Sequence, residues 1–492
     1  MVVISDKEST SYKDWVLLPQ YSEVHPSEVD ISSRLSKNIL LKLPVVSSPM
    51  DTVTESDMAI AMALHGGIGV IHKYLTIPEQ VREVEKAKRF RSGVIDRPYV
   101  ISPQQTLRDL ELLIQTTGKS RFPVTENGQP DGKLVGMITD KDAIDYNIEQ
   151  VQTHMTPFSE LVVSRSTEKE ETRRLLLEKR KEVVPLVDDD NNLRGIITFS
   201  DIRKSKEYPY ASKDAKERLI VGAAVGVNDL DRVKALADAY ADVIVVDASH
   251  GDTKNVISTV EAIKGSYKFD VIAGNVVTKQ GVEHLAEAGA DGIRVGIGVG
   301  ASCTTHVTVG HGRGQATAVM ECAIAAEAYE VPIIADGSIK ETGQASLALA
   351  MGASAVMLGG MLAFTEEAAC PPDRQKFKRG DVWYKTYRGM GSSSALARGL
   401  QVNSSRYAQA KMIENKYSPE GIETEGRIIG PVVMFLDELR AAISKATSGQ
   451  GARDIEELWA KAVIERVSPN AAADALPAYR PSKDEPNYST SR

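Results

Sequence analysis

One cysteine of the chain, Cys303, lies in a stretch unusually rich in glycine, VGIGVGASCTTHVTVGHGRGQ (295–315). So many glycines in so short a segment disfavour a helix and suit a loop that bends sharply or approaches a ligand. A thiolate on such a loop can attack an electrophilic carbon, and nearby backbone amides can stabilise the anion. The alternative is a small buried residue, the commoner state of an isolated cysteine.

The elements that would carry this loop form a regular series. Segments such as 229–241, 278–290 and 341–353 have helical periodicity and lie between short apolar runs. Continuous apolar strands alternating with helices indicate a parallel sheet covered on both faces. Eight such strands close an α/β (β/α)8 TIM barrel; an open doubly wound sheet is the alternative, but no GxGxxG follows the first strand. The apolar runs are 43–51, 66–73, 219–226, 242–251, 269–277, 292–300, 331–338 and 353–360.

Residues at the carboxyl ends of these strands are the candidates for chemistry, because reactive groups of such barrels lie there. That position favours the nucleophilic interpretation of Cys303. Glycines after the last two strands, in ADGS and LGGML, suit phosphate binding or ordinary turns. Asp336 could accept hydrogen bonds from a ribose or cap a helix. The strand-end candidates are Ser48, Met50, Asp247, Ser249, Asn275, Cys303, Asp336 and Gly360.

A second region interrupts the barrel pattern. Residues 122–144 and 184–202 look like two copies of one unit, about 60 residues apart, each ending in Thr-x-x-Asp before a helix. The residues alone leave open a duplicated structural module or a nucleotide site with Asp142 and Asp201 facing ribose hydroxyls. We therefore predict a catalytic barrel from residues 1–92 and 209–492, and an inserted domain at 93–208.

The segment from about 365 to 430 is long, polar and poorly periodic, and we predict a loop there. A loop of that length in a compact domain is usually functional or disordered. Its charged residues, Arg406 and Glu420 among them, would by default be solvated. Helical periodicity returns at 430–446.

Composition limits the class of protein. The chain has 492 residues, a net charge of −8 and three cysteines, which argues against a nucleic-acid surface, a disulfide framework or a cysteine-rich zinc site. No secretory signal or membrane span is visible, and the histidines lack metal-ligand spacing. We expect a cytoplasmic protein without membrane or nucleic-acid partners; a peroxisome-type compartment stays open.

Taken together, the motifs resemble one family over nearly the whole chain. SSPMDTVTE, GGIGVIHK, GAAVG, AGNVVT, CTT and YRGMGS are similar to those of the inosine monophosphate dehydrogenase and guanosine monophosphate reductase family. The inserted repeats resemble a tandem cystathionine-β-synthase (CBS, Bateman) domain. The resemblance implies regulatory purine nucleotides there, and homotetramers that can pair into octamers. The implied regulatory contacts are Thr139, Asp142, Thr198 and Asp201.

The same resemblance implies roles in the barrel. Cys303 would add to purine C2, Thr305 and Glu420 would manage protons around a leaving ammonia, and the Arg406–Tyr407 pair would activate water. The purine nucleotide would contact Ser48, Met50, Ser302, Asp336, Gly337, Gly359, Gly360, Tyr387, Gly389 and Met390. The nicotinamide cofactor would lie beside Asp247, Ser249, Asn275 and Arg294. A monovalent cation such as K+ would bind backbone carbonyls of Gly298, Gly300 and Cys303.

Two positions depart from the family pattern. Where the family usually has a phosphate-binding serine, this chain has Ala301, and Ser302 follows one position later as a candidate substitute. Where the family usually has Asp-Gly-Gly, this chain has Asp336-Gly337-Ser338. These departures affect the details of phosphate binding.

The motifs disagree about the direction of the reaction. SSPMDTVTE, YRGMGS, the inserted modules and Arg406–Tyr407 resemble the dehydrogenase, whereas VMLGGML and AVMECA resemble the reductase. We expect a GMP reductase that uses NADPH; the alternative is an IMP dehydrogenase that uses NAD. A nucleotide sensor without turnover is a further alternative, disfavoured by the joint presence of Cys303, Thr305 and Glu420.

Overall fold

The computed structural model describes residues 8–90, 94–95, 98–143, 148–166, 169–198, 207–403 and 418–475. The chain divides into two compact units. Unit 1 consists of Met1–Ala87, Tyr210–Ser212 and Ile220–Arg492, and unit 2 consists of Lys88–Pro209 and Lys213–Leu219.

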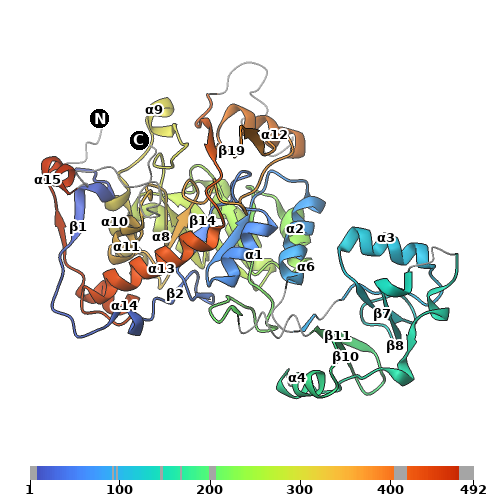
Figure 1. Ribbon diagram of the computed structural model, residues 1–492. Helices are drawn as coiled ribbons and strands as arrows, with labels where there is room; N and C mark the ends of the chain where they lie inside the picture. The colour runs from blue at the N-terminus through green and yellow to red at the C-terminus, as the bar shows by residue number, and fades with distance from the viewer. Residues whose placement is uncertain are drawn as a thin grey trace. The chain divides into compact units, whose positions relative to one another are not determined.

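Eight of the described strands close a parallel barrel in unit 1 (Figure 1). Going round the barrel, they are β12 (Gly222–Val225), β13 (Val243–Asp247), β14 (Asp270–Val276), β15 (Gly292–Val295), β16 (Ile333–Asp336), β17 (Ala355–Leu358), β4 (Val45–Ser47) and β5 (Ile68–Ile71). Most of their residues are β-branched or small and buried, as strands covered on both faces require. The closed barrel confirms the predicted (β/α)8 fold and excludes the open sheet.

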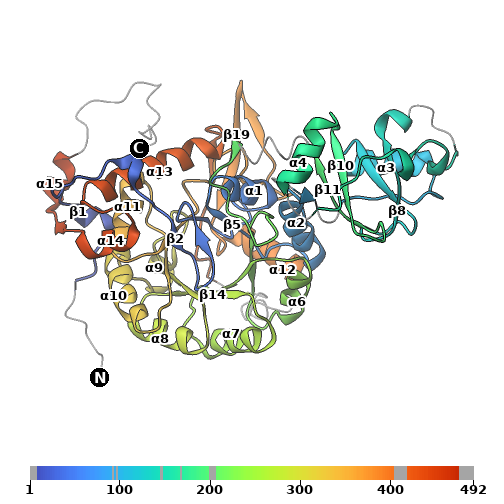
Figure 2. The same cartoon turned by 90° about the horizontal axis from the view of Figure 1, so that it is seen from below.

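Helices surround this barrel, as the view along it shows for α6, α7, α8 and α10 (Figure 2). Their inner faces pack on the strands in one continuous apolar core. Several begin at a side chain that caps the first turn, such as Thr253 and Thr278, which accept backbone N–H groups. The helices are α1 (Ser56–Leu64), α2 (Ile77–Arg89), α6 (Leu230–Asp238), α7 (Lys254–Ser266), α8 (Lys279–Glu287), α10 (Gln315–Glu327), α11 (Thr342–Ala350) and α13 (Val432–Ser448).

The amino-terminal end of the barrel is closed by a small hairpin, β2 (Ser33–Arg34) and β3 (Leu40–Leu41). Leu35 and Leu41 are fully buried in the apolar cluster inside the barrel. The carboxylate of Asp270, at the start of β14, accepts a hydrogen bond from Ser36 at 2.5 Å and fixes the hairpin turn. The opposite end of the barrel is therefore the one open to a ligand.

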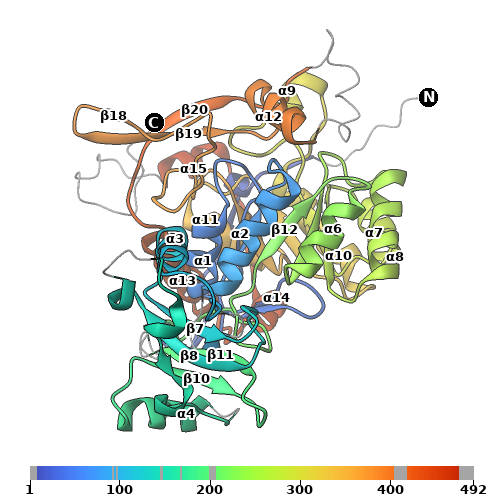
Figure 3. The same cartoon turned by 90° about the vertical axis from the view of Figure 1, so that its right-hand side faces the viewer.

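A β-ribbon lies at that end, beside α9 (Thr305–Val309) and α12 (Ser393–Asn403) (Figures 1 and 3). It consists of β18 (Phe377–Arg379), β19 (Val382–Arg388) and β20 (Glu423–Arg427), paired antiparallel. The predicted loop at 365–430 is therefore wrong for these segments. The sequence gives no apolar alternation over β20, ETEGR, because that strand is held by its backbone ladder rather than by a buried face.

The remaining elements of unit 1 lie outside the ring of helices or extend its edge. Strand β1 (Trp15–Leu17) pairs antiparallel with β21 (Ile464–Arg466). The others are η1 (Tyr12–Asp14), η2 (Pro26–Glu28), α14 (Ile455–Lys461) and α15 (Pro469–Asp474).

Unit 2 repeats one pattern of helix and hairpin. The first copy has α3 (Leu107–Thr117), β7 (Arg121–Thr125) and β8 (Leu134–Thr139); the second has α4 (Lys169–Glu178), β10 (Val183–Val187) and β11 (Leu193–Thr198). Both hairpins shift register at equivalent places, Val124/Thr125 and Leu186/Val187. The short elements are β6 (Val94–Ile95), η3 (Asp140–Ala143), η4 (Val151–Thr153), β9 (Thr156–Pro157) and η5 (Phe158–Glu160). The identification of this unit as a regulatory CBS domain stays a prediction.

Candidate active site

A cavity of about 260 Å³ lies at the carboxyl ends of the barrel strands. The sequence-predicted residues at this cavity are Ser48, Met50, Asp247, Ser249, Asn275, Arg294, Gly298, Gly300, Ser302, Cys303, Thr305, Asp336, Gly337, Gly359, Gly360, Tyr387, Gly389, Met390 and Glu420. The fold thus brings together candidates from the carboxyl ends of six of the barrel strands and from the segments around the ribbon. Their individual roles stay predictions.

Cys303 is half-buried and connected to a carboxylate through one hydroxyl. Its Sγ lies 3.1 Å from Thr305 Oγ1, and Thr305 Oγ1 donates a hydrogen bond to Glu420 Oε2 at 2.8 Å. A threonine hydroxyl has a single proton. Because that proton points to Glu420, the thiol is the donor in the bond between Cys303 and Thr305. The arrangement is a path for the thiol proton toward Glu420.

The loop that carries Cys303 is held against the ribbon by backbone hydrogen bonds. Ile422 N donates to Ser302 O at 2.9 Å, and Thr304 N donates to Glu420 O at 3.0 Å. Gly389 N in turn donates to Ile422 O at 3.0 Å. These bonds flank an isolated antiparallel bridge between Cys303 and Gly421, just before β20, so the position of the thiol depends on the position of the ribbon.

A buried arginine organises the opposite wall. Arg294, on β15, donates to Asp247 at 2.8 Å and to Asp336 at 2.7 Å. Asn275 Nδ2 donates to the same Asp336 oxygen at 2.9 Å. Lys73, just after β5, completes the series with an ion pair to Asp247 at 2.9 Å. Asp336 therefore presents its carboxylate to the cavity in a fixed orientation.

The charges of this wall stabilise one another. Burial works against ionisation of Asp247, but the positive charges of Lys73 and Arg294 outweigh it and lower the pKa of that carboxyl. Burial also works against the charge on Arg294, and the two aspartates Asp336 and Asp247 more than compensate and raise its pKa. The carboxylate oxygens of Asp247 are already occupied by these pairs, so its direct contact with a cofactor stays a prediction.

Two glycines of the cavity are required by backbone geometry. A Cβ on Gly296 would lie 2.0 Å from the carbonyl oxygen of Asp336, and Gly337 has a φ of +103°, in the left-handed region. A side chain at either position would displace the strand ends that hold Asp336.

Small residues and one phenol line the side of the cavity next to β17. A Cβ on Gly360 would lie 3.0 Å from Ala301 Cβ, and one on Gly359 would lie 3.0 Å from Met50 Sδ. Burial raises the pKa of Tyr387, so its hydroxyl stays a neutral hydrogen-bond donor. These residues leave a recess of backbone and hydroxyl groups.

Lys73 is the main residue of the cavity that sequence reasoning missed. It lies two residues after the end of strand β5, so the same strand-end rule that predicts Asp247 applies to it. For the cation site, the carbonyl of Gly300 accepts a hydrogen bond from Cys303 N at 3.1 Å. A monovalent cation on the carbonyls of Gly298, Gly300 and Cys303 stays a prediction.

Some predicted residues fall elsewhere. Arg406, Tyr407 and Asp201 lie outside the described residues. In unit 2, Asp142 Oδ2 accepts both the backbone N–H and the hydroxyl of Thr139, each at 2.8 Å, which is a local capping arrangement. Thr198 ends strand β11 at the place equivalent to Thr139.

The described residues contain neither a candidate metal cluster nor a membrane-spanning helix. No group of three or more His, Cys, Asp or Glu side chains is placed there as metal ligands would be. Nor does that part of the chain contain a helix long and apolar enough to cross a membrane.

The fold and the cavity define a (β/α)8-barrel enzyme with a thiol at the carboxyl ends of its strands. The chain belongs to the IMP dehydrogenase / GMP reductase family, whose domain model matches residues 9–477, and is an oxidoreductase of that family.

The similar proteins carry both names of the family. The inosine-5'-monophosphate dehydrogenase of Aquifex aeolicus is 43% identical over 470 residues, 94% of each chain. That of Bacillus subtilis is 41% identical over 492 residues, 99% of each. Among solved structures, the GMP reductase of Trypanosoma brucei in complex with guanosine 5'-monophosphate has a TM-score of 0.87 and 33% identity, covering 97% of this chain and 99% of that one.

Proposed function

We propose that this protein is a GMP reductase, which converts GMP to IMP and ammonia with NADPH as reductant. The observation that carries the proposal is the hydrogen-bonded series from Cys303 through Thr305 to Glu420. It supplies a nucleophile and a proton carrier at one place, which the displacement of an amine requires.

The proposed reaction has two stages. In the first, the thiol proton passes through Thr305 to Glu420, and the Cys303 sulfur forms a bond to purine C2. The C2–N bond then breaks, and Glu420 returns the proton so that the amine leaves as ammonia. When bound, the nicotinamide cofactor supplies a hydride to C2. The bond between sulfur and C2 then breaks, which releases IMP and regenerates the thiolate.

The cavity offers matching contacts for a nucleotide. Asp336, oriented by Arg294 and Asn275, has the geometry of an acceptor for the ribose hydroxyls. The recess beside Gly359 and Gly360 is lined by residues with small or no side chains, so a phosphate group could approach backbone N–H groups there. The solved complex of the Trypanosoma brucei reductase with guanosine 5'-monophosphate supports a purine nucleotide as substrate.

The cofactor side is consistent with the residues present. Arg294 Nε is buried and has no hydrogen-bond partner within the described residues, so an acceptor on a bound ligand would satisfy it. Ser249 is exposed at the edge of the cavity, where it could donate to the cofactor. Asp247 and Arg294 would act by orienting Asp336, and Asn275 by fixing the same carboxylate.

IMP dehydrogenase is the second candidate. The observation that favours it is the 41–43% identity with dehydrogenases over 94–99% of each chain. In that direction hydride leaves C2 of IMP for NAD, and water, activated by Arg406 and Tyr407, hydrolyses the purine–Cys303 intermediate to XMP. Gly360 argues against it, because the resemblance associates Gly-Gly at 359–360 with the reductase.

Absorbance at 340 nm separates the two. We expect NADPH to be consumed with GMP, with one ammonia released per NADPH, and no NADH to form from IMP and NAD. NADH formation from IMP at a rate well above the GMP-dependent rate would refute the proposal.

Unit 2 carries a separate proposal. We infer that it is a tandem CBS domain that binds purine nucleotides and changes assembly into tetramers or octamers. The repeated helix and hairpin support this, as does the Trypanosoma brucei reductase solved with guanosine 5'-triphosphate, at a TM-score of 0.76 and 33% identity. Calorimetry with GTP and ATP, on the full chain and on the Asp142→Ala variant, tests it. Equal binding by both proteins would contradict the role of Asp142.

A further inference from the structure

Arg388 is a buried cation that the proposed reaction does not use. It lies between Tyr387 and Gly389, both of which line the cavity, yet its own side chain is not among the lining residues. The side chain is fully buried, on the last residue of β19. A buried guanidinium is costly unless it is fully paired, so its partners show what it does.

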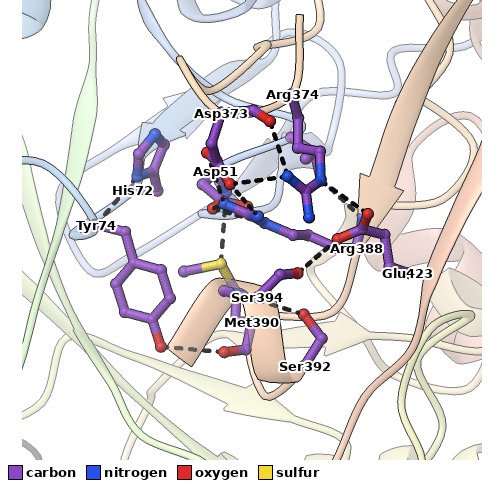
Figure 4. Close-up of polar contacts among 12 residues, drawn as sticks. Asp51, His72, Tyr74, Asp373, Arg374, Arg388, Met390, Ser392, Ser394 and Glu423 are labelled. Atoms are coloured by element: carbon purple, nitrogen blue, oxygen red, sulfur yellow. Dashed lines mark hydrogen bonds and ion pairs between the residues drawn. The ribbon is translucent and has the colours of Figure 1, made fainter. Parts of the chain in front are cut away.

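The first partner is on the barrel. Asp51, only 1% exposed, accepts from Arg388 Nη2 at 2.6 Å and from Nε at 3.0 Å (Figure 4). Both of these bonds end on Asp51 Oδ2, and Nε makes a longer bond of 3.3 Å to Oδ1, so three contacts to one carboxylate fix the position of the guanidinium. Asp51 directly follows Met50, a cavity residue, so the pair joins the end of β19 to the loop after β4.

The second partner is on the segment before the ribbon. Asp373 accepts from Arg388 Nη1 at 2.9 Å. The neighbouring Arg374 donates to Glu423 at 2.8 Å, and Ser394 donates to the other oxygen of Glu423 at 2.5 Å (Figure 4). Glu423 begins β20. A series of ion pairs therefore connects Asp51 on the barrel, through Arg388 and the Asp373–Arg374 segment, to Glu423 at the start of β20.

Met390 is held by two further bonds of this region. The backbone N–H of Asp51 donates to Met390 Sδ at 3.4 Å, and Tyr74 donates its hydroxyl proton to Met390 O at 3.0 Å. Arg388 pairs with Glu423 in the β19–β20 ladder. Arg388 is thus two residues from Met390 in sequence. It also pairs with the first residue of β20, the strand that follows Glu420.

We propose that Arg388, fixed between Asp51 and Asp373, is a positioning residue: it sets the ribbon on the barrel so that Glu420 reaches Thr305 and Met390 lies over the substrate. The inference rests on the proposed function for the role of Glu420. Loss of either aspartate would let the ribbon shift, which lengthens the path from the thiol to Glu420.

Two charge-removing variants and one matched control test this. Asp51→Asn removes the buried partner and Asp373→Asn the half-exposed one. Asp381→Asn removes an exposed carboxylate from the turn of the same ribbon. We expect kcat to fall about 20-fold or more for Asp51→Asn and about 3–10-fold for Asp373→Asn, with KM for GMP within about threefold, because small displacements of catalytic groups are expensive. The Asp381→Asn enzyme should match the parent.

A second measurement reports on the thiol without turnover. The rate of Cys303 alkylation by iodoacetamide, resolved from Cys322 and Cys370 by mass spectrometry, should fall about fivefold or more in Asp51→Asn, because the thiol then loses its proton acceptor. In the double variant the kcat losses should be less than multiplicative, since both aspartates act through Arg388.

The outcomes are separable. If the folded Asp51→Asn and Asp373→Asn proteins keep kcat and the alkylation rate within about twofold of the parent, the proposal is overturned. A rise in KM with unchanged alkylation overturns it too. If Asp51→Asn does not fold, Asp373→Asn decides alone. If the parent oxidises IMP instead of reducing GMP, the proposed function fails, and the alkylation rates still decide the positioning role.

Discussion

Replacement of Glu420 by glutamine tests the proton path most directly. The amide keeps the shape of the side chain and can still accept a hydrogen bond from Thr305, which now lies at 2.8 Å from Glu420 Oε2. It cannot take up the thiol proton or return it to a leaving amine. We therefore expect Glu420→Gln to bind GMP with nearly unchanged KM and to turn over much more slowly.

The magnitude follows from the geometry. One hydroxyl separates the thiol from the carboxylate, so the proton transfer of the proposed reaction passes through this path. Such catalysis contributes about 10²–10⁴-fold, which is about 2.7–5.4 kcal/mol of barrier. Because Thr305 and Glu420 act in series, Thr305→Val should cost a similar factor. The double variant should lose no more than the worse single one.

The assay is NADPH consumption at 340 nm with saturating GMP, together with ammonia release. Glu425→Gln is the matched control, since Glu425 lies on β20 and pairs with Arg379 at the surface. Its kcat should be unchanged. A loss below about fivefold for Glu420→Gln, or losses that multiply in the double variant, would refute the proton path.

The remaining predictions concern other parts of the molecule. Cys303→Ser should abolish turnover and keep nucleotide affinity within about tenfold, because a hydroxyl is the weaker nucleophile; measurable turnover contradicts this. Deletion of residues 93–208 should spare catalysis, since the barrel strands lie outside the deletion; a folded but inactive product contradicts it. Arg406→Ala should cost less than about tenfold, or about 1.4 kcal/mol, and a burst of NADH from IMP would reverse the assignment. Burial lowers the pKa of Lys385 to about 8, below its value of about 10.4 in an unfolded chain. Between pH 8 and 10 the unfolded state therefore binds more protons than the folded state, and the free energy of unfolding should rise with pH because of Lys385. An equal rise in the Lys385→Met variant would contradict this prediction.

The barrel could be predicted from sequence because its strands carry their own signal. Each strand is buried on both faces, so runs such as DVIVVDASHG are apolar throughout and end in polar residues. The end of the strand then marks the edge of the cavity, which is why the strand-end rule predicts Asp247 and Asp336. The same rule also applies to Lys73, two residues after β5.

The ribbon could not be predicted in the same way. Its strand β20 has a mostly exposed, polar sequence, and its stability comes from the ladder with β19 and from charge pairs such as Arg374–Glu423. Those contacts join residues 35 to 49 positions apart, and no local pattern encodes them. The role proposed for Glu420 follows only from the family resemblance, since an isolated loop carboxylate is usually solvated.

The attachment of the cysteine loop to the ribbon has a consequence for protein synthesis. The last barrel strand, β17, ends at Leu358, and Glu420 emerges from the ribosome some sixty residues later. A nascent chain can thus complete its barrel strands before it contains Glu420, the carboxylate that we propose accepts the proton of Cys303. The thiol therefore meets its proposed proton acceptor only after all eight barrel strands have been made.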